Sequence, residues 1–310
     1  MKHLCREKGG IVLQRLIIIG NGFERAHKLP TEYSDFMEQL TEEHAKFYNT
    51  ICQYIPEDSL WASFEEALAE LDDEQLQDDN SCYLLGYGDE NWRDSAHHDF
   101  QYMIGEALSF ASDIPQYFSK WIRSIDTDVP PIMPAHIVDK SNLYLSFNYT
   151  DTLEMVYNIP TKNILYIHGK ARRGDELIVG HHSDDLVQDE PEPQFDSEEE
   201  RQIYYDNYDE DVRLTEAKGI IKSYFKSTYK DTETIIKTNR GFFNSLSQIS
   251  EIYIYGHSLS DIDFAYFDEI NNSVLPCCKW YISYHSESDY KKAEKFVKAL
   301  NIPSYQFFKS

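Results

Sequence analysis

Short apolar runs and longer stretches with helical periodicity divide the chain into expected strands and expected helices. The run from Leu16 to Ile19 ends at Gly20 and is typical of a strand buried on both faces of a parallel sheet. Thr31 can cap a helix that follows it. The apolar side chains of that helix recur on one face at Tyr33, Phe36, Met37 and Leu40. The pattern predicts a first unit of strand, glycine turn and helix.

The later chain alternates between helical stretches and short strands. Helical periodicity continues from about residue 42 to residue 123 and ends before Pro130, Pro131 and Pro134. Strands are then predicted at 143–147, 164–167 and 177–179, a helical stretch at about 203–247, strands at 252–255 and 280–283, and a helix at 290–300.

This order predicts an α/β fold with a Rossmann-like parallel sheet and two helical insertions. The length of 310 residues and the apolar content of 41% allow a single domain over residues 1–310. We expect its core at about 11–40, 140–182 and 249–310. One helical insert is expected at about 41–135. An acidic loop, interpreted as solvated, and a second helical insert are expected at about 183–248.

Composition narrows the classes of function. The 54 acidic and 29 basic residues give a formal net charge of −25, which repels nucleic acid and makes it an unlikely partner. The five scattered cysteines predict neither a disulfide framework nor a zinc ribbon. Because the apolar run at residues 11–19 is too short for a membrane span or a signal segment, we expect a cytoplasmic protein without membrane contact.

Four polar clusters directly follow the predicted strands. They are Gly20 to Glu24, Ser146 to Asp151, His168 with Gly169, and Gly256 to Asp263. Ligands of open α/β sheets bind at the carboxyl ends of the strands. We therefore expect the chemistry of this chain at that edge of the sheet.

The first cluster, Gly20 to Glu24, is a candidate nucleotide-binding loop that includes Asn21 and Phe23. Its two glycines allow a tight turn and a close approach to a ligand, and the following helix would offer free N–H groups to phosphate. Arg25 stands where the dinucleotide fingerprint requires a third glycine, which disfavours a dehydrogenase. A plain strand-to-helix turn is the structural alternative.

Asn148 and His168 are the candidate catalytic residues. The amide of Asn148 can hold a ribose hydroxyl or an attacking water, although an Asx turn would explain it as well. The imidazole of His168 titrates near neutrality and suits general-base catalysis, although a lone histidine is more often structural.

The last cluster is a candidate site for ribose or phosphate. Its candidate binding residues are Gly256, His257, Ser258, Asp261 and Asp263. Helix capping explains Ser258 to Asp263 about equally well. His181 and His182 could join His168 and His257 as metal ligands, but their spacing matches no metal motif, and we expect no metal.

Beyond these clusters, the sequence resembles the AbiH family of bacterial abortive-infection proteins. The residues that carry the resemblance are Ile19 to Glu24, Ala26, His27, Leu29 to Thr31, Tyr33 to Phe36, Ser146 to Thr150, His168, Gly169, Gly180, His181, Gly256 to Leu259, Asp261 and Asp263. The family usually has Asp where Glu24 stands and Gly where Lys28 stands. The resemblance implies phage defence in which the infected cell stops growing or dies, but it names no reaction.

More remotely, the order of these clusters is similar to the sirtuin arrangement, which binds NAD at this edge. The likeness implies that Gly20 and Gly22 face the pyrophosphate, that Asn148 holds water or ribose and that His168 activates the attacking group. Ser258 would line the adenosine side. The sequence has Thr150 and Asp151 where a single acid is expected, and it lacks the four-cysteine zinc module, so protein deacylation is disfavoured.

Three functional hypotheses follow. The leading one is a defence effector that binds NAD, as substrate or ligand, and cleaves its nicotinamide glycosidic bond with water. The alternatives are a metal-dependent phosphoesterase or nuclease and a non-catalytic, nucleotide-gated phage sensor. The expected partners are a nucleotide, a phage-derived trigger and further copies of this chain.

Overall fold

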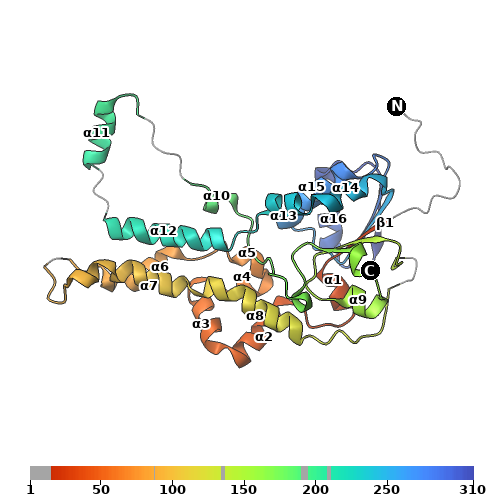
Figure 1. Cartoon of the computed structure of the whole chain (residues 1–310), viewed down its shortest axis with the longest axis horizontal. Coiled ribbons are helices and arrows are strands. Elements are labelled where there is room, and N and C mark those ends of the chain that lie inside the picture. Colours follow the sequence, from red (N-terminus) through yellow and green to blue (C-terminus); the bar gives the residue numbers. More distant parts are fainter. Residues whose placement is uncertain (1–14, 87, 134–136, 190–194, 208–210) are drawn as a thin grey trace. The chain divides into compact units, whose positions relative to one another are not determined.

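The computed structural model describes residues 15–86, 88–133, 137–189, 195–207 and 211–310. The expected core residues 11–14 lie outside these ranges. The chain divides into two compact units (Figure 1). We call Met1–Phe36, Pro115–Ile178 and Asp231–Ser310 the sheet unit, and Met37–Ile114 with Val179–Lys230 the helical unit.

The sheet unit is built on one six-stranded sheet in which every pair of neighbouring strands is parallel. The strands are β1 (Arg15–Ile19), β2 (Leu143–Ser146), β3 (Ile164–Tyr166), β4 (Glu251–Tyr255), β5 (Lys279–Tyr284) and β6 (Tyr305–Lys309). Their order is β3-β2-β1-β4-β5-β6, which is the order of the doubly wound dinucleotide-binding fold. The prediction of an α/β fold with a parallel sheet is confirmed, and the order reverses between β1 and β4.

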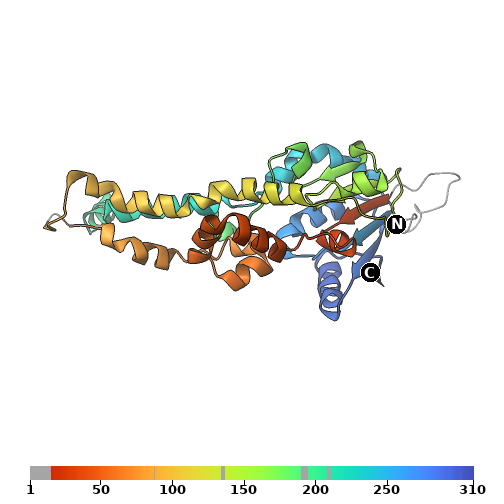
Figure 2. The ribbon, with the colours of Figure 1, turned by 90° about the horizontal axis from the view of Figure 1, so that it is seen from below.

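Alternate residues of the central strands pack on opposite faces of the sheet. Leu16 and Ile18 join a core formed with Phe267 of α15 (Phe264–Ser273) and Phe296 of α16 (Glu287–Ala299). Ile17 and Ile19 join a second core around Tyr144, Phe23 and Leu153. Figure 2 shows β1, in red, beside strands from the end of the chain, in blue. Burial on both faces explains why β1 reads as an uninterrupted apolar run.

The helices of the sheet unit lie between its strands along the chain. They are α1 (Asn21–Ala26), α9 (Thr152–Tyr157), η3 (Thr161–Asn163), η4 (Ala171–Arg173), α13 (Thr232–Thr238), α14 (Arg240–Ser245), η5 (Leu246–Gln248), η6 (Asp261–Asp263), α15 (Phe264–Ser273) and α16 (Glu287–Ala299). Two helices, α2 (Tyr33–Glu43) and α8 (Phe110–Ser124), run across the division between the units.

The helical unit is formed by two separate segments of the chain, 37–114 and 179–230. Its elements are α3 (Ala45–Tyr54), α4 (Glu57–Ala62), α5 (Phe64–Ala67), α6 (Asp73–Asn80), η1 (Ser81–Tyr83), η2 (Asp94–His98), α7 (Asp99–Leu108), α10 (Asp184–Val187), α11 (Glu198–Asn207) and α12 (Val212–Ser227). Within the described ranges, no helix is long and apolar enough to cross a membrane.

Several local predictions are wrong. Residues 177–179 form no strand, and the Ile178 amide instead donates to the carbonyl oxygen of His168. Thr31 does not cap a helix, because its hydroxyl is buried without a hydrogen-bond partner and α2 begins at Tyr33. The strand β6 was not predicted.

The second insertion also differs from its prediction. The acidic stretch expected as a loop contains the short helix α10, and α11 begins inside it at Glu198. The helical stretch expected at 203–247 is divided among α11, α12, α13 and α14. Asp211 and Asp231 each accept a backbone N–H at a new helix start, which restarts the helix at both points.

Candidate functional site

The loops after β1 and β4 touch through their backbones at the point where the strand order reverses. The amide of Gly22 donates to the carbonyl oxygen of Gly256 over 2.7 Å. A Cβ atom on Gly20 would lie 2.7 Å from the Cα of His257. One on Gly256, where φ is +64°, would lie 2.4 Å from the backbone nitrogen of Phe23. These three glycines therefore allow a loop-to-loop contact that no other residue type would fit.

Asn148 holds the β1 loop to the end of β2. Its side-chain nitrogen donates to the carbonyl oxygen of Gly20 over 3.1 Å and to the Glu24 carboxylate over 3.0 Å. Both hydrogens of the amide are thereby used. In this conformation Asn148 positions the loop, and a catalytic contact with water or ribose stays a prediction.

Glu24 is a buried carboxylate at the centre of the same network. Its oxygens accept hydrogen bonds from Asn148 and from the hydroxyls of Thr150 and Thr152, both over 2.7 Å. Burial raises the pKa of the Glu24 carboxyl above its ordinary value, against the lowering effect of these donors. Glu24 thus links α1 to the loop after β2 and to the start of α9, and a contact with a ligand stays a prediction.

His168 and His257 share one carboxylate at the carboxyl edge of the sheet. His168 follows β3, His257 follows β4, and Asp263 ends η6. The Nε2 atom of His168 lies 3.9 Å from one carboxylate oxygen of Asp263, and that of His257 lies 3.4 Å from the other. The structure therefore brings together three of the predicted site residues, which we call the histidine–aspartate cluster.

The tautomer of His257 follows from its contacts. Its Nδ1 atom accepts the backbone N–H of Leu259 over 2.9 Å, so the neutral ring carries its proton on Nε2, toward Asp263. Phe147 packs edge-on against His257 with ring centroids 4.3 Å apart and also against His168. The two imidazole side chains are only 3% and 4% exposed. A carboxylate between two buried imidazoles can hold and orient a proton acceptor, as general-base catalysis requires.

The other predicted side chains of these loops differ in exposure. Asn21 is exposed, and its side chain donates to the carbonyl oxygen of Thr31 over 2.7 Å. Phe23 is buried in the second core. Ser258 and Asp261 are exposed. Only the exposed groups are available to a ligand without a change in the loops.

Sequence reasoning missed a second histidine network beside the β1 loop. The Nδ1–H of His27 donates to the carbonyl oxygen of Phe23 over 2.7 Å, and the Tyr157 hydroxyl donates to Nε2 over 2.6 Å. Tyr157 in turn accepts the amides of Ile132 and Met133. Burial lowers the pKa of His27. The only signal in the sequence was that His27 is among the residues that carry the resemblance to the AbiH family.

His181 and His182, the other candidate metal ligands, belong to the helical unit. The ring of His181 contacts the carbonyl oxygen of Phe225 and accepts the amide of Ser183, and His182 contacts the carbonyl oxygen of Lys230. Across the residues that the structure describes, no group of three or more His, Cys, Asp or Glu side chains could hold a metal ion.

The fold and the strand-end clusters define the class of protein to which this chain belongs. The protein is a Rossmann-like α/β protein, because its sheet is all-parallel, has this strand order and carries polar loops at its carboxyl edge. The chain belongs to the AbiH family, described as bacteriophage abortive infection AbiH, whose match covers residues 16–284. No curated protein and no solved structure matches it. Membership in the family implies a role in defence against phage by abortive infection.

Proposed function

We propose that this AbiH protein carries out its defence role by binding NAD at the carboxyl edge of the sheet and cleaving the nicotinamide glycosidic bond. The observation that carries the proposal is the histidine–aspartate cluster, His168, Asp263 and His257, at the ends of β3 and β4. Strand-end loops beside a reversal of strand order are the usual place for a dinucleotide in such sheets. A sirtuin-like placement of NAD belongs to the same proposal.

The proposed reaction needs one base and good positioning. Water attacks the anomeric carbon of the nicotinamide-side ribose, the bond to the nicotinamide nitrogen breaks, and nicotinamide leaves with the bonding electron pair. The proton of the water passes to His168, and Asp263 stabilises the imidazolium that forms. The products are ADP-ribose, nicotinamide and a proton.

The other predicted residues take supporting roles in this proposal. The Gly20–Gly22 loop and Gly256 lie toward the pyrophosphate, and Asn148 sets the loop through Gly20. Asn21, Ser258 and Asp261 are the exposed polar side chains available to the ribose and adenosine groups. Phe23 and Glu24 keep the loop in shape from the buried side.

The burial of both imidazoles adds one requirement. NAD reaches His168 only if the loops around it open, because the His168 side chain is almost fully covered and the rings of Phe147, Tyr149 and Tyr266 pack against it. A phage-derived trigger would supply the free energy for that opening by binding the open state more tightly. An effector that is harmless to the uninfected cell fits such a closed resting state.

The test compares the NAD content of cells that express the wild-type chain, His168→Gln or the control His285→Gln, before and after phage infection. His285 is an exposed histidine of the same unit. The proposal is supported if infected cells lose NAD and are protected from phage with the wild type and with His285→Gln, but show neither effect with His168→Gln. Thermal unfolding must show that His168→Gln is folded. Stable NAD during successful protection would overturn it. Metal-dependent phosphodiester cleavage by the purified chain would favour the phosphoesterase alternative instead.

A further inference from the structure

The net charge of the protein lies entirely in the helical unit. Residues 37–114 and 179–230 contain 33 acidic and 8 basic side chains, a formal net charge of −25. The rest of the chain contains 21 of each and is neutral overall. A field of this size attracts cationic partners over long range and repels nucleotides and nucleic acid.

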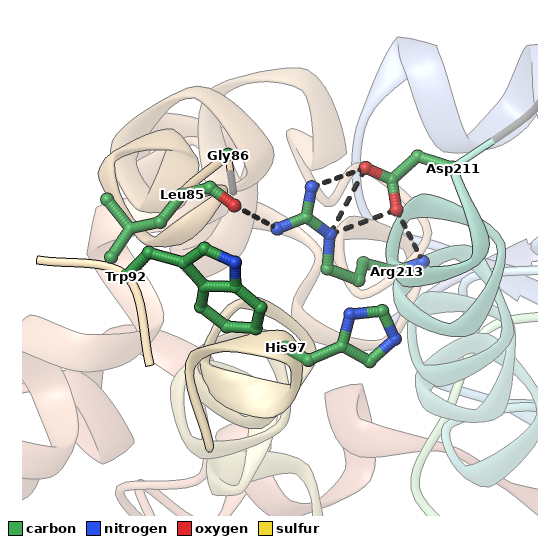
Figure 3. A pocket seen from close by; sticks show the side chains of 6 residues that line it. All are labelled: Leu85, Gly86, Trp92, His97, Asp211 and Arg213. Atoms are coloured by element: carbon green, nitrogen blue, oxygen red, sulfur yellow. Dashed lines mark hydrogen bonds and ion pairs between the residues drawn. The ribbon is translucent and has the colours of Figure 1, made fainter. Parts of the chain in front are cut away.

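The helical unit also contains a pocket of about 210 Å³. Figure 3 shows its lining residues, which are Leu85, Gly86, Trp92, His97, Asp211 and Arg213. They come from the segment between η1 and α7 and from the start of α12. The side chains of Trp92, His97 and Arg213 border the same space in Figure 3.

Arg213 is held rigidly in the wall of this pocket. Its Nε and Nη2 atoms donate to the Asp211 carboxylate, at distances from 2.6 to 3.1 Å, and Nη1 donates to the carbonyl oxygen of Leu85 over 2.8 Å. The Arg213 side chain is 14% exposed and that of Asp211 is 35% exposed. The more accessible charge in the wall is therefore the carboxylate.

The pocket wall contains residue types that are common in protein-binding surfaces. Val212 stands next to Asp211 in sequence and is 59% exposed, so it offers apolar surface beside the pocket. Trp and rigidly held Arg are the residue types that most often dominate protein–protein binding energy. A pocket with both, beside an exposed apolar side chain, fits an anchor residue of a partner protein.

We propose that the pocket receives an arginine side chain from a basic segment of a partner protein. A guanidinium is planar and cationic, so it stacks on the indole of Trp92 and is attracted by Asp211 and the field of the helical unit. A lysine ammonium lacks the planar face for this stacking. The inference concerns the helical unit and is independent of the reaction proposed for the sheet unit.

The test measures binding of two labelled peptides, oligo-arginine and oligo-lysine of equal length, to the full chain by fluorescence anisotropy at physiological ionic strength. The arginine peptide is expected to bind more tightly. Trp92→Ala should weaken its binding about five- to tenfold and remove the preference for arginine over lysine, because the cation–π contact is lost. Trp92→Phe should retain part of the preference.

A matched pair of variants distinguishes binding in the pocket from attraction of the peptide by the overall negative charge of the helical unit. Asp211→Asn and Glu42→Gln each remove one negative charge, and Glu42 is an exposed residue of α2 that does not line the pocket. Asparagine still caps α12, so the helix start is kept. Asp211→Asn should weaken binding of the arginine peptide more than Glu42→Gln does. Equal effects of the two variants, or equal binding of both peptides to the wild-type chain, would overturn the proposal.

Discussion

The amide of Gly22 donates to the carbonyl oxygen of Gly256 over 2.7 Å, and this bond joins the loop after β1 to the loop after β4. The two loops are far apart in sequence but follow neighbouring parallel strands. Their contact lies at the carboxyl ends of the strands where the strand order reverses, which is the place where a doubly wound sheet usually binds a dinucleotide. The glycine positions that suggested a ligand-binding loop therefore also have a structural role in the contact between the two loops.

Replacement of Gly256 by alanine should destabilise the sheet unit. The added Cβ would lie 2.4 Å from the backbone nitrogen of Phe23, and the residue has φ of +64°. We expect a loss of more than about 2 kcal/mol in the free energy of unfolding, measured by urea denaturation. The matched control is Gly241→Ala in α14, where no atom lies within 4 Å of the added Cβ. An equal effect of both variants would contradict the role of the loop contact.

Lys28 adopts a left-handed conformation, with φ of +61°. Glycine adopts this conformation without the strain that a side chain adds. Lys28→Gly should therefore raise the free energy of unfolding by about 0.5–1 kcal/mol. Lys295→Gly, in the exposed face of α16, should lower it by about 1 kcal/mol. Loss of stability in both variants would show that Lys28 is not strained.

The sequence predicts the strands best where an apolar run ends at a glycine. β1 and β4 are found because Leu16 to Ile19 and Ile252 to Tyr255 are apolar runs that end at glycine. β6 is missed because it is an edge strand whose first two residues, Tyr305 and Gln306, are exposed, so it has neither an apolar run nor a clear alternation. Residues 177–179 are apolar but have no partner strand, and an apolar run alone does not establish one.

The candidate site is predicted only in part, because its pairings depend on the conformations of loops. Because parallel strands end at one edge of the sheet, the strand pattern alone places His168 and His257 at the same edge. It does not predict that Asp263 lies between them or that Asn148 uses its amide on Gly20 and Glu24. These pairings depend on loop conformations, including the left-handed residues Gly256 and Leu259. The pattern of apolar and polar residues does not predict these loop conformations.

Ionisation of Glu24 should make the stability of the sheet unit depend on pH. Because burial raises the pKa of its carboxyl, the folded state binds the proton more tightly than the unfolded state. The resulting stabilisation is full below the unfolded pKa of about 4.3 and is lost as the pH rises through the folded value. The stability of the wild type relative to Glu24→Gln should thus fall with rising pH, measured by urea denaturation from acid to neutral pH. A relative stability that rises with pH would contradict a raised pKa.

His27 should give the opposite dependence. Burial lowers the pKa of its imidazole, so the unfolded state takes up a proton first as the pH falls. The stabilisation is full above the unfolded pKa of about 6.5 and is lost as the pH falls below it toward the folded value. In His27→Gln, the fall in unfolding free energy between neutral and mildly acid pH should be smaller than in the wild type. Tyr157→Phe keeps the histidine but removes the hydroxyl that donates to it, so the pH dependence should persist on a lower baseline stability. If the wild type and His27→Gln had the same pH profile, His27 would not be neutral and buried in the folded protein.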